Sequence, residues 1–330
     1  MRLVLAPMEG LLDAVLRDTL TRVGGYDWAV AEFARVSGTV LPHRCYRRSC
    51  PELARGGRTS AGTPVRVQLL GDDPQCLADN AAHLAQLSPP GIDLNFGCPA
   101  PTVNRHRGGA VLLDEPELLF AIAVAVRRAV PQGMPYSAKM RLGVAEPGRA
   151  VECAAALAAG GVEEIVVHAR TRDDGYRPPA RWEWIARIAD AVAIPVIANG
   201  EVWTESDWRR CRAESGVADV MLGRGAVADP FLARRIREDV GSPGADDAER
   251  RDAEWRALRP LVADFWRQVQ RKVLSRHAPG RMKQWLNLLR RSQSRAETLY
   301  QEIRPMRHPA EIDAALLRHG IAAAPDVLAA

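Results

Sequence analysis

A single cysteine stands where a predicted strand meets a glycine-rich turn. Residues 94–110 read LNFGCPAPTVNRHRGGA, with Cys98 between Gly97 and Pro99 at the point where the strand stops. A thiol at the end of such a strand is a candidate catalytic group. The structural alternative is a small buried thiol, an interpretation that suits Cys153 and Cys211. The polar residues around Cys98 in the fold must decide between the two.

Polar side chains recur at the ends of the other predicted strands. They are Glu9, Glu32, Arg35, Gln68, Asn95, Lys139, Arg141, His168, Arg170, Asn199 and Arg224. Each one has a structural explanation, since an amide can satisfy backbone groups and Lys139 can pair with a carboxylate such as Glu32. Buried polar groups are costly unless paired, however, and Lys139 lies in the middle of the strand SAKMR. Together these residues predict a ligand site.

The elements that position these residues alternate between strands and helices. Eight short apolar runs predict strands at residues 2–7, 28–33, 65–70, 91–97, 136–141, 164–170, 195–200 and 218–224. Their near-continuous hydrophobicity is typical of a parallel sheet buried on both faces. Amphipathic stretches lie between them, as at residues 117–130 and 150–161. The sequence therefore predicts an α/β fold, a (β/α)8 TIM barrel. A doubly wound open sheet would show fewer strands and a GxGxxG motif after the first.

The pattern changes after the eighth strand. Residues 241–250, GSPGADDAER, resemble a linker, and the chain after them has no strand candidate. Helices are predicted at residues 253–274, 281–293, 294–302 and 309–318. The aromatic residues expected in the core of these helices are Trp255, Phe265, Trp266 and Trp285. We predict a barrel domain at residues 1–243 and a small helical domain at residues 244–330.

Composition narrows the class of protein. The chain has 330 residues, 47% of them hydrophobic, and no apolar run of eighteen or more, so a transmembrane span is not expected. The start, MRLVLAPMEG, is interpreted as the first strand rather than as a signal peptide. The six cysteines form no CxxC pair and match no zinc module, so no metal site is predicted and reduced thiols in the cytoplasm are expected.

Charge is concentrated in the C-terminal region. Residues 245–330 hold 16 Lys and Arg against 11 Asp and Glu, which accounts for the whole net charge of +5. Between residues 271 and 295 there are eight basic residues and no acid. A solvated helix face is the simple explanation. A window of this length without an acid favours a surface for a polyanion.

The barrel mouth has the residue types of a phosphate and ring site. NGE (199–201) and GRG (223–225) come after the last two strands, where barrels commonly bind phosphate. The amides of Gln68 and Asn95 suit a planar heterocycle, and Lys139 would stabilise negative charge on it. Flavin mononucleotide (FMN) fits these features, as would another phosphorylated ligand.

Taken together, the motifs resemble those of the tRNA-dihydrouridine synthases, most closely the C subfamily. The matching segments run in order through the barrel and into the tail: APMEG (6–10), EF-R (32–35), VQLLG (67–71), DLNFGCP (93–99), VNRHRGGAVLL (103–113), KMRLG (139–143), VVHART (166–171), GY (175–176), IANGE (197–201), GRGA (223–226) and RMKQW (281–285). Nearly the whole chain is covered. DLN-GCP and KxRLG are specific together, whereas GRG alone is not.

The resemblance implies an FMN-dependent reduction, driven by NADPH, of the C5–C6 double bond of a uridine in the tRNA D-loop, at position 16. Hydride would pass from flavin N5 to C6, and Cys98 would give a proton to C5. A thiol suits a general acid, because its ordinary pKa of about 8.5 leaves it protonated near neutral pH. The positions matching the family's flavin site are Pro7, Met8, Glu9, Gln68, Lys139, His168, Asn199, Gly200, Glu201, Gly223 and Arg224. Asn95, Arg141 and Tyr176 match positions that face the RNA.

The resemblance also implies a tRNA partner bound at its D-arm and elbow, with the target base swung out to lie on the flavin. The residues expected to orient the tRNA are Arg35, Arg281, Lys283 and Arg295. A cytoplasmic monomer is expected. Two alternatives stay open: an FMN barrel that reduces a small molecule, such as a dihydropyrimidine or an enone, and an RNA-binding protein on a degenerate barrel.

Overall fold

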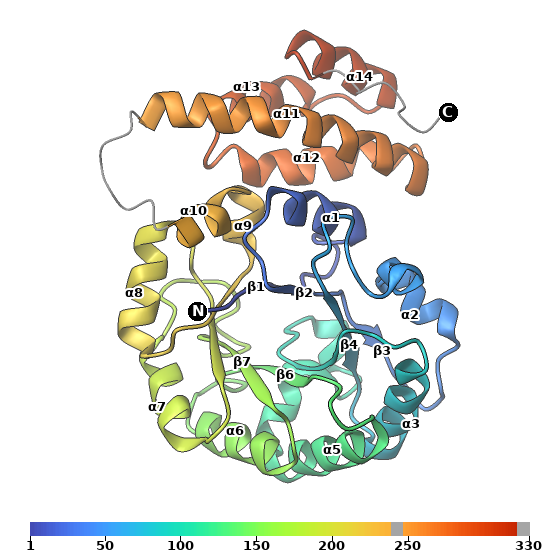
Figure 1. Ribbon diagram of the computed structural model, residues 1–330, viewed down its shortest axis with the longest axis vertical. Coiled ribbons are helices and arrows are strands. Elements are labelled where there is room, and N and C mark those ends of the chain that lie inside the picture. The colour runs from blue at the N-terminus through green and yellow to red at the C-terminus, as the bar shows by residue number, and fades with distance from the viewer. Residues whose placement is uncertain (239–246, 322–330) are drawn as a thin grey trace. The chain divides into compact units, whose positions relative to one another are not determined.

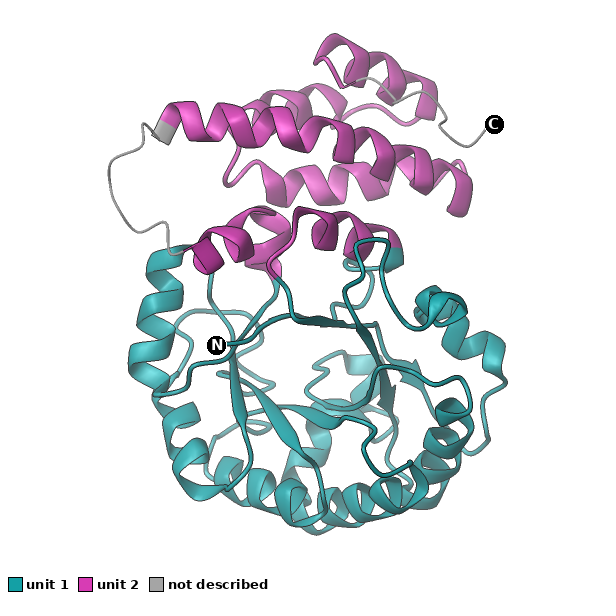
Figure 2. Ribbon diagram, in the orientation of Figure 1, with its two compact units in different colours: residues 1–14, 26–223 teal, residues 15–25, 224–330 magenta. Residues whose placement is uncertain are grey.

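The computed structural model describes residues 1–238 and 247–321. Two compact units make up the chain. The first comprises Met1–Ala14 and Tyr26–Gly223, and the second comprises Val15–Gly25 with the described part of Arg224–Ala330 (Figure 2). The predicted boundary between residues 243 and 244 lies outside the described residues.

The first unit is a closed parallel barrel. Its strands are β1 (Leu3–Leu5), β2 (Trp28–Val30), β3 (Ala34–Arg35), β4 (Val65–Leu70), β5 (Ile92–Phe96), β6 (Tyr136–Arg141), β7 (Glu164–His168), β8 (Val196–Asn199) and β9 (Val220–Leu222). They are arranged in the order β2-β1-β9-β8-β7-β6-β5-β4-β3, and pairing of β2 with β4 closes the ring. Since β2 and β3 occupy one position in the ring, the predicted eight-stranded TIM barrel is confirmed (Figure 1).

The second barrel strand is interrupted by a bulge. Val30 pairs with Arg66 and Ala34 pairs with Leu69, so this strand advances four residues while β4 advances three. One extra residue in a strand bends it and leaves part of it unpaired. The sequence predicted an unbroken strand at residues 28–33, and the bulge is the difference.

Helices surround the barrel. They are α2 (His43–Ser49), α3 (Pro74–Ala85), α4 (Pro101–Asn104), α5 (Pro116–Ala129), α6 (Ala150–Ala159), α7 (Glu183–Ala191) and α8 (Glu205–Ser215), with 3-10 turns η1 (Pro51–Arg55) and η2 (Gly109–Asp114). Local sequence sets the starts of several. Asp73 accepts from Cys76 N and precedes Pro74 at the start of α3, and Thr204 with Asp207 forms a capping box on α8. Figure 1 shows the longer helices outside the ring of strands.

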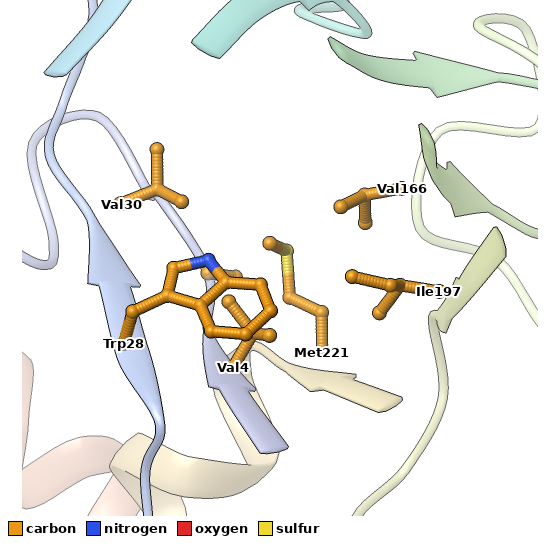
Figure 3. Packing of buried hydrophobic residues seen from close by; sticks show 7 residues of the cluster. Val4, Trp28, Val30, Val166, Ile197 and Met221 are labelled. Atoms are coloured by element: carbon orange, nitrogen blue, oxygen red, sulfur yellow. The ribbon is translucent and has the colours of Figure 1, made fainter. Parts of the chain in front are cut away.

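The inside of the barrel has an apolar side. Buried residues of β1, β2, β7, β8 and β9 form one cluster: Val4, Ala6, Trp28, Val30, Val166, Ile197 and Met221. Figure 3 shows their side chains pointing toward one another. None of them comes from β4, β5 or β6, where polar residues are buried instead. This division leaves the other side of the interior polar.

The second unit is helical. It contains α1 (Ala14–Val23), α9 (Arg224–Ala228), α10 (Leu232–Glu238), α11 (Asp247–Lys272), α12 (Ala278–Leu289), α13 (Ser294–Ile303) and α14 (Pro309–Arg318). The aromatic residues predicted for its core are buried, and the rings of Phe265 and Trp285 meet edge to face with centroids 4.7 Å apart. Trp266 Nε1 donates to Asp313 Oδ1 at 2.6 Å and ties α11 to α14. Among the described residues, no helix is both long and apolar enough to cross a membrane.

Candidate active site

A buried carboxylate anchors the polar side of the barrel. Gln68, Asp93 and Ser137 are register neighbours on β4, β5 and β6. Gln68 Nε2 and Ser137 Oγ both donate to the Asp93 carboxylate, each at 2.6 Å. Burial raises the pKa of Asp93, and the two hydrogen bonds oppose that shift. The sequence prediction did not include Asp93 or Ser137 among the site residues.

Asn95 connects this layer to the cysteine. It lies two residues after Asp93 and therefore shares the same face of β5. Asn95 Nδ2 donates to Gln68 Oε1 at 2.7 Å. Asn95 Oδ1 accepts from the backbone N–H groups of Gly97 and Cys98, each at 2.9 Å. Three of the predicted residues, Gln68, Asn95 and Cys98, are thus joined by hydrogen bonds.

The carbonyl group of Cys98 is held by hydrogen bonds, as its N–H group is. Its carbonyl oxygen accepts from Asn104 Nδ2 at 2.8 Å and from Ala110 N at 3.0 Å. Gly109, with φ of 69°, packs so closely that a Cβ there would lie 2.6 Å from this oxygen. The thiol is partly exposed, and burial raises its pKa. Cys98 is therefore a protonated thiol at neutral pH, with its peptide groups fixed on both sides.

Lys139 is a cation without a close partner. It pairs in register with Asn95 and is partly exposed. In residues 1–238 and 247–321 Lys139 makes no hydrogen bond or ion pair, so the predicted alternative of a pair with Glu32 is wrong. Glu32 accepts a hydrogen bond from Gly10 N. Burial and the charge of Arg141 lower the pKa of Lys139 to about 8, against the attraction of Asp93 and Cys98.

Arg141, His168 and Tyr176 form a second group. Arg141 donates to the carbonyl oxygens of Gly97, Thr171 and Gly175 at 2.8 to 2.9 Å. Its guanidinium carbon lies 5.4 Å from the centre of the Tyr176 ring, which meets the His168 ring edge to face at 6.3 Å. Tyr176 is 54% exposed although it is anchored in this way. A half-exposed aromatic ring with a fixed orientation suits stacking on a base.

The residues after β8 adopt a tightly bonded turn. Asn199 Nδ2 donates to Met221 O at 2.8 Å, and Gly200 O accepts from Trp182 Nε1 at 3.0 Å. Glu201 makes an ion pair with the fully buried Arg170 and accepts from Trp203 Nε1 at 3.0 Å. Hydrogen bonds thus hold the turn at several points. Its Glu201 carboxylate is already paired with Arg170, which the sequence places among the polar strand-end residues but outside the positions matching the flavin site.

The ends of β1, β3 and β9 carry the remaining predicted barrel residues. Pro7 and Met8 are partly exposed and Glu9 is exposed. A Cβ on Gly223 would lie 3.7 Å from Met8 Sδ, so these two strand ends adjoin. Arg35 ends β3 and is partly exposed. Arg224 is the first residue of α9 and belongs to the second unit.

The predicted tRNA-binding residues of the tail have partners within the second unit. Lys283 Nζ donates to Met306 O, and Arg281 contacts Gln284 Oε1. Arg295 pairs with Asp252 at 2.9 Å, with both side chains about half exposed. Acids from outside the acid-free stretch thus reach part of it. The described part of the chain holds no group of three His, Cys, Asp or Glu residues placed to bind a metal ion.

A family model identifies the family of this chain. The model described as "Dihydrouridine synthase (Dus)" matches residues 4–320. The chain belongs to the dihydrouridine synthase family. A dihydrouridine synthase saturates a double bond of the uracil ring, which is a two-electron reduction, and the chain is a flavin-dependent oxidoreductase acting on tRNA.

Relatives of high identity carry a more specific name. The chain is 58% identical to the tRNA-dihydrouridine(16) synthase of Aquipseudomonas alcaligenes over 92% of this chain and 95% of that protein. It is 57% identical to the protein of the same name from Pseudomonas putida, over 92% and 93%. With that of Ralstonia nicotianae the identity is 55%, over 98% and 99%.

Solved structures with the same barrel are more distant. A 2-naphthoyl-CoA reductase complex superposes with a TM-score of 0.54 at 11% identity, over 71% of this chain and 50% of that chain. A variant of NCR from Zymomonas mobilis gives 0.50 at 14% identity, over 72% and 86%. At these identities the likeness shows the fold alone.

The residues of this dihydrouridine synthase fit a flavin. Lys139 supplies a positive charge that no side chain neutralises by direct pairing among the residues that the structure describes. The Asn95 amide has a second N–H besides the one it donates to Gln68. A ring with carbonyl oxygens and an anionic reduced form needs such groups. Asp93 was detectable in principle, because a carboxylate inside the apolar strand IDLNF is costly without a purpose.

Proposed function

We propose that this chain reduces uridine 16 in the D-loop of tRNA, with FMN as cofactor and NADPH as reductant, in the cytoplasm and as a monomer. The observation that carries the proposal is the Cys98 backbone held through Asn95 to Gln68, with Lys139 beside Asn95 and without a hydrogen bond or ion pair among the described residues. The name shared by relatives at 55–58% identity supports the position and the substrate.

Each polar group has a part in this proposal. The bound flavin supplies the hydride that is added to C6 of the uracil ring. Cys98 delivers a proton to C5, and the raised pKa of its thiol keeps that proton in place at neutral pH. Lys139 holds negative charge at the edge of the ring. Gln68, His168, Asn199, Gly200 and their neighbours in the predicted flavin set hold the cofactor.

The tRNA would be held by both the barrel and the helical tail. Asn95, Arg141 and Tyr176 face the target nucleotide in this proposal, and Tyr176 offers its exposed ring for stacking. Arg35 and the tail residues Arg281, Lys283 and Arg295 would orient the tRNA through its phosphates. Lys283 and Arg295 would then exchange their present partners for phosphate oxygens.

The test is a map of dihydrouridine in tRNA from cells that lack this gene. We expect dihydrouridine to be lost at position 16 alone and to be restored by the wild-type gene but not by Cys98→Ala. The purified protein with FMN and NADPH should act on a tRNA transcript and not on one in which cytidine replaces uridine 16. Loss at a different position, or turnover of small enones without any action on tRNA, would contradict the proposal.

A further inference from the structure

The hydrogen bonds between Asp93 and Cys98 form one directional chain. An ionised Asp93 carboxylate accepts hydrogen bonds and donates none, so Gln68 turns its NH2 toward it and its oxygen toward Asn95. Asn95 then turns its NH2 toward Gln68 and its oxygen toward the Gly97 and Cys98 N–H groups. The carboxylate at one end and the two backbone N–H groups at the other therefore favour the same orientation of both amides. We call these four residues, Asp93, Gln68, Asn95 and Cys98, the Asp93 relay.

We propose that Asp93, with Ser137, is a positioning residue that orients the Gln68 and Asn95 amides and thereby holds the loop bearing Cys98 in place. The proposal rests on the proposed function, in which Cys98 gives up a proton. Asp93 is 1% exposed and Ser137 is 2% exposed, so neither is placed to meet substrate directly. Gln68 is fully buried as well, so their effect reaches the substrate through Asn95 and the partly exposed Cys98.

The relay also decides which groups the site offers. Gln68 and Asn95 each use one N–H of the side-chain amide inside the relay, which leaves one N–H on each. Asn95 Oδ1 already accepts twice. The Gln68 amide is fully buried, so the remaining N–H of Asn95 is the donor that this layer presents, and it favours a ligand that places a carbonyl oxygen above it. If both amides turned round, the Asn95 NH2 would face two backbone N–H groups, and the loop would lose its support.

Ser137 makes a sharp test available. In Asp93→Asn the new amide can still accept from Gln68 through its oxygen, provided that its NH2 donates to Ser137 Oγ. A hydroxyl can reverse its role from donor to acceptor. The relay therefore survives in Asp93→Asn as long as Ser137 is present. It is lost in Asp93→Ala, and it is weakened in the double variant Asp93→Asn/Ser137→Ala, where the new NH2 group has no acceptor at residue 137. The volume of the double variant is close to that of the wild type.

Two readouts separate the relay from the charge of Asp93, which all three variants lack. The first is alkylation of Cys98 by iodoacetamide in the flavin-free protein, followed peptide by peptide with mass spectrometry. The second is single-turnover formation of dihydrouridine in tRNA. Glu164→Ala is the control, because Glu164 is a barrel carboxylate with 7% side-chain exposure whose ion-pair partners, Arg2 and Arg66, make no hydrogen bond to the relay, although the charge of Arg66 acts on Asp93.

We expect Asp93→Ala and the double variant to alkylate at Cys98 about tenfold faster than Asp93→Asn, and to form dihydrouridine about tenfold more slowly, as the loss of one buried hydrogen bond implies. Asp93→Asn and Glu164→Ala should differ little from each other in both rates. Equal rates in Asp93→Asn and the double variant would overturn the proposal. If wild-type protein forms no dihydrouridine, the proposed function fails, while the alkylation rates still decide whether the relay exists.

Discussion

Gly109 packs against the Cys98 backbone, and Gly109→Ala tests whether that close approach matters. The added Cβ would lie 2.6 Å from Cys98 O and 2.9 Å from Cys98 Cβ. Atoms at these distances cannot coexist, so the loop must move. The φ of 69° adds a second cost, since it is a conformation that alanine rarely adopts.

The magnitude comes from these two costs. A left-handed backbone costs about 1–2 kcal/mol for a residue with a Cβ. Overpacking a filled site costs about 1–3 kcal/mol more. We therefore expect Gly109→Ala to lower the free energy of unfolding by about 2–5 kcal/mol. Relief of the clash would also shift Cys98, and a displacement near 1 Å can slow a positioned reaction about a hundredfold.

Gly133→Ala is the matched control. Gly133 has φ of 81°, and no atom lies within 4 Å of the place that a Cβ would take, so it carries the backbone cost without the clash. Urea unfolding and single-turnover dihydrouridine formation should be measured for both variants. Gly133→Ala should lose about 1–2 kcal/mol and keep its turnover. Equal unfolding losses in the two variants, or full turnover in Gly109→Ala, would refute the reasoning.

Four further predictions concern the site and the charge pattern. Cys98→Ala should keep the yellow flavin and the affinity for tRNA while dihydrouridine formation collapses; full activity in this variant would refute the proton donor. The affinity for FMN should fall as pH rises through about 8, because Lys139 then loses its charge, and Lys139→Met should show no such step by flavin fluorescence. Conversely, the flavin-free protein should gain stability from this group between pH 8 and its ordinary pKa, since the unfolded chain binds the extra proton there. The logarithm of the tRNA affinity, measured by filter binding, should fall linearly with the logarithm of the salt concentration. An affinity that does not change with salt would exclude the basic tail as the contact surface.

The barrel could be predicted from the sequence because parallel strands buried on both faces are almost purely apolar. All eight predicted strands occur, although most are shorter than expected. The bulge could not be predicted, since residues 31–33 (AEF) have ordinary strand composition. Register between β2 and β4 depends on pairing across the sheet, and local composition does not encode it.

Site residues could be predicted where the burial of a polar group is costly, and not where their contacts involve residues distant in the sequence. Gln68, Asn95 and Cys98 were predicted because polar residues at the ends of apolar strands indicate a ligand site. Hydrogen bonds join these three residues in the structure. Asp93 was missed, although the cost of its burial was visible in the strand. The pairing of Arg295 with Asp252 depends on how the tail helices pack, which the spacing of charges does not reveal.

The extra residue in the second barrel strand has a consequence for how this protein can change. A bulge takes up one extra residue, so the residues on either side of it keep their partners and their faces. Arg35 comes after the bulge and pairs with Leu70, so removal of one residue from 31–33 would let the strand pair with β4 without interruption and leave Arg35 on the same side. Length variation at this point would therefore change the bend of the strand and leave the side on which the proposed tRNA contact emerges unchanged.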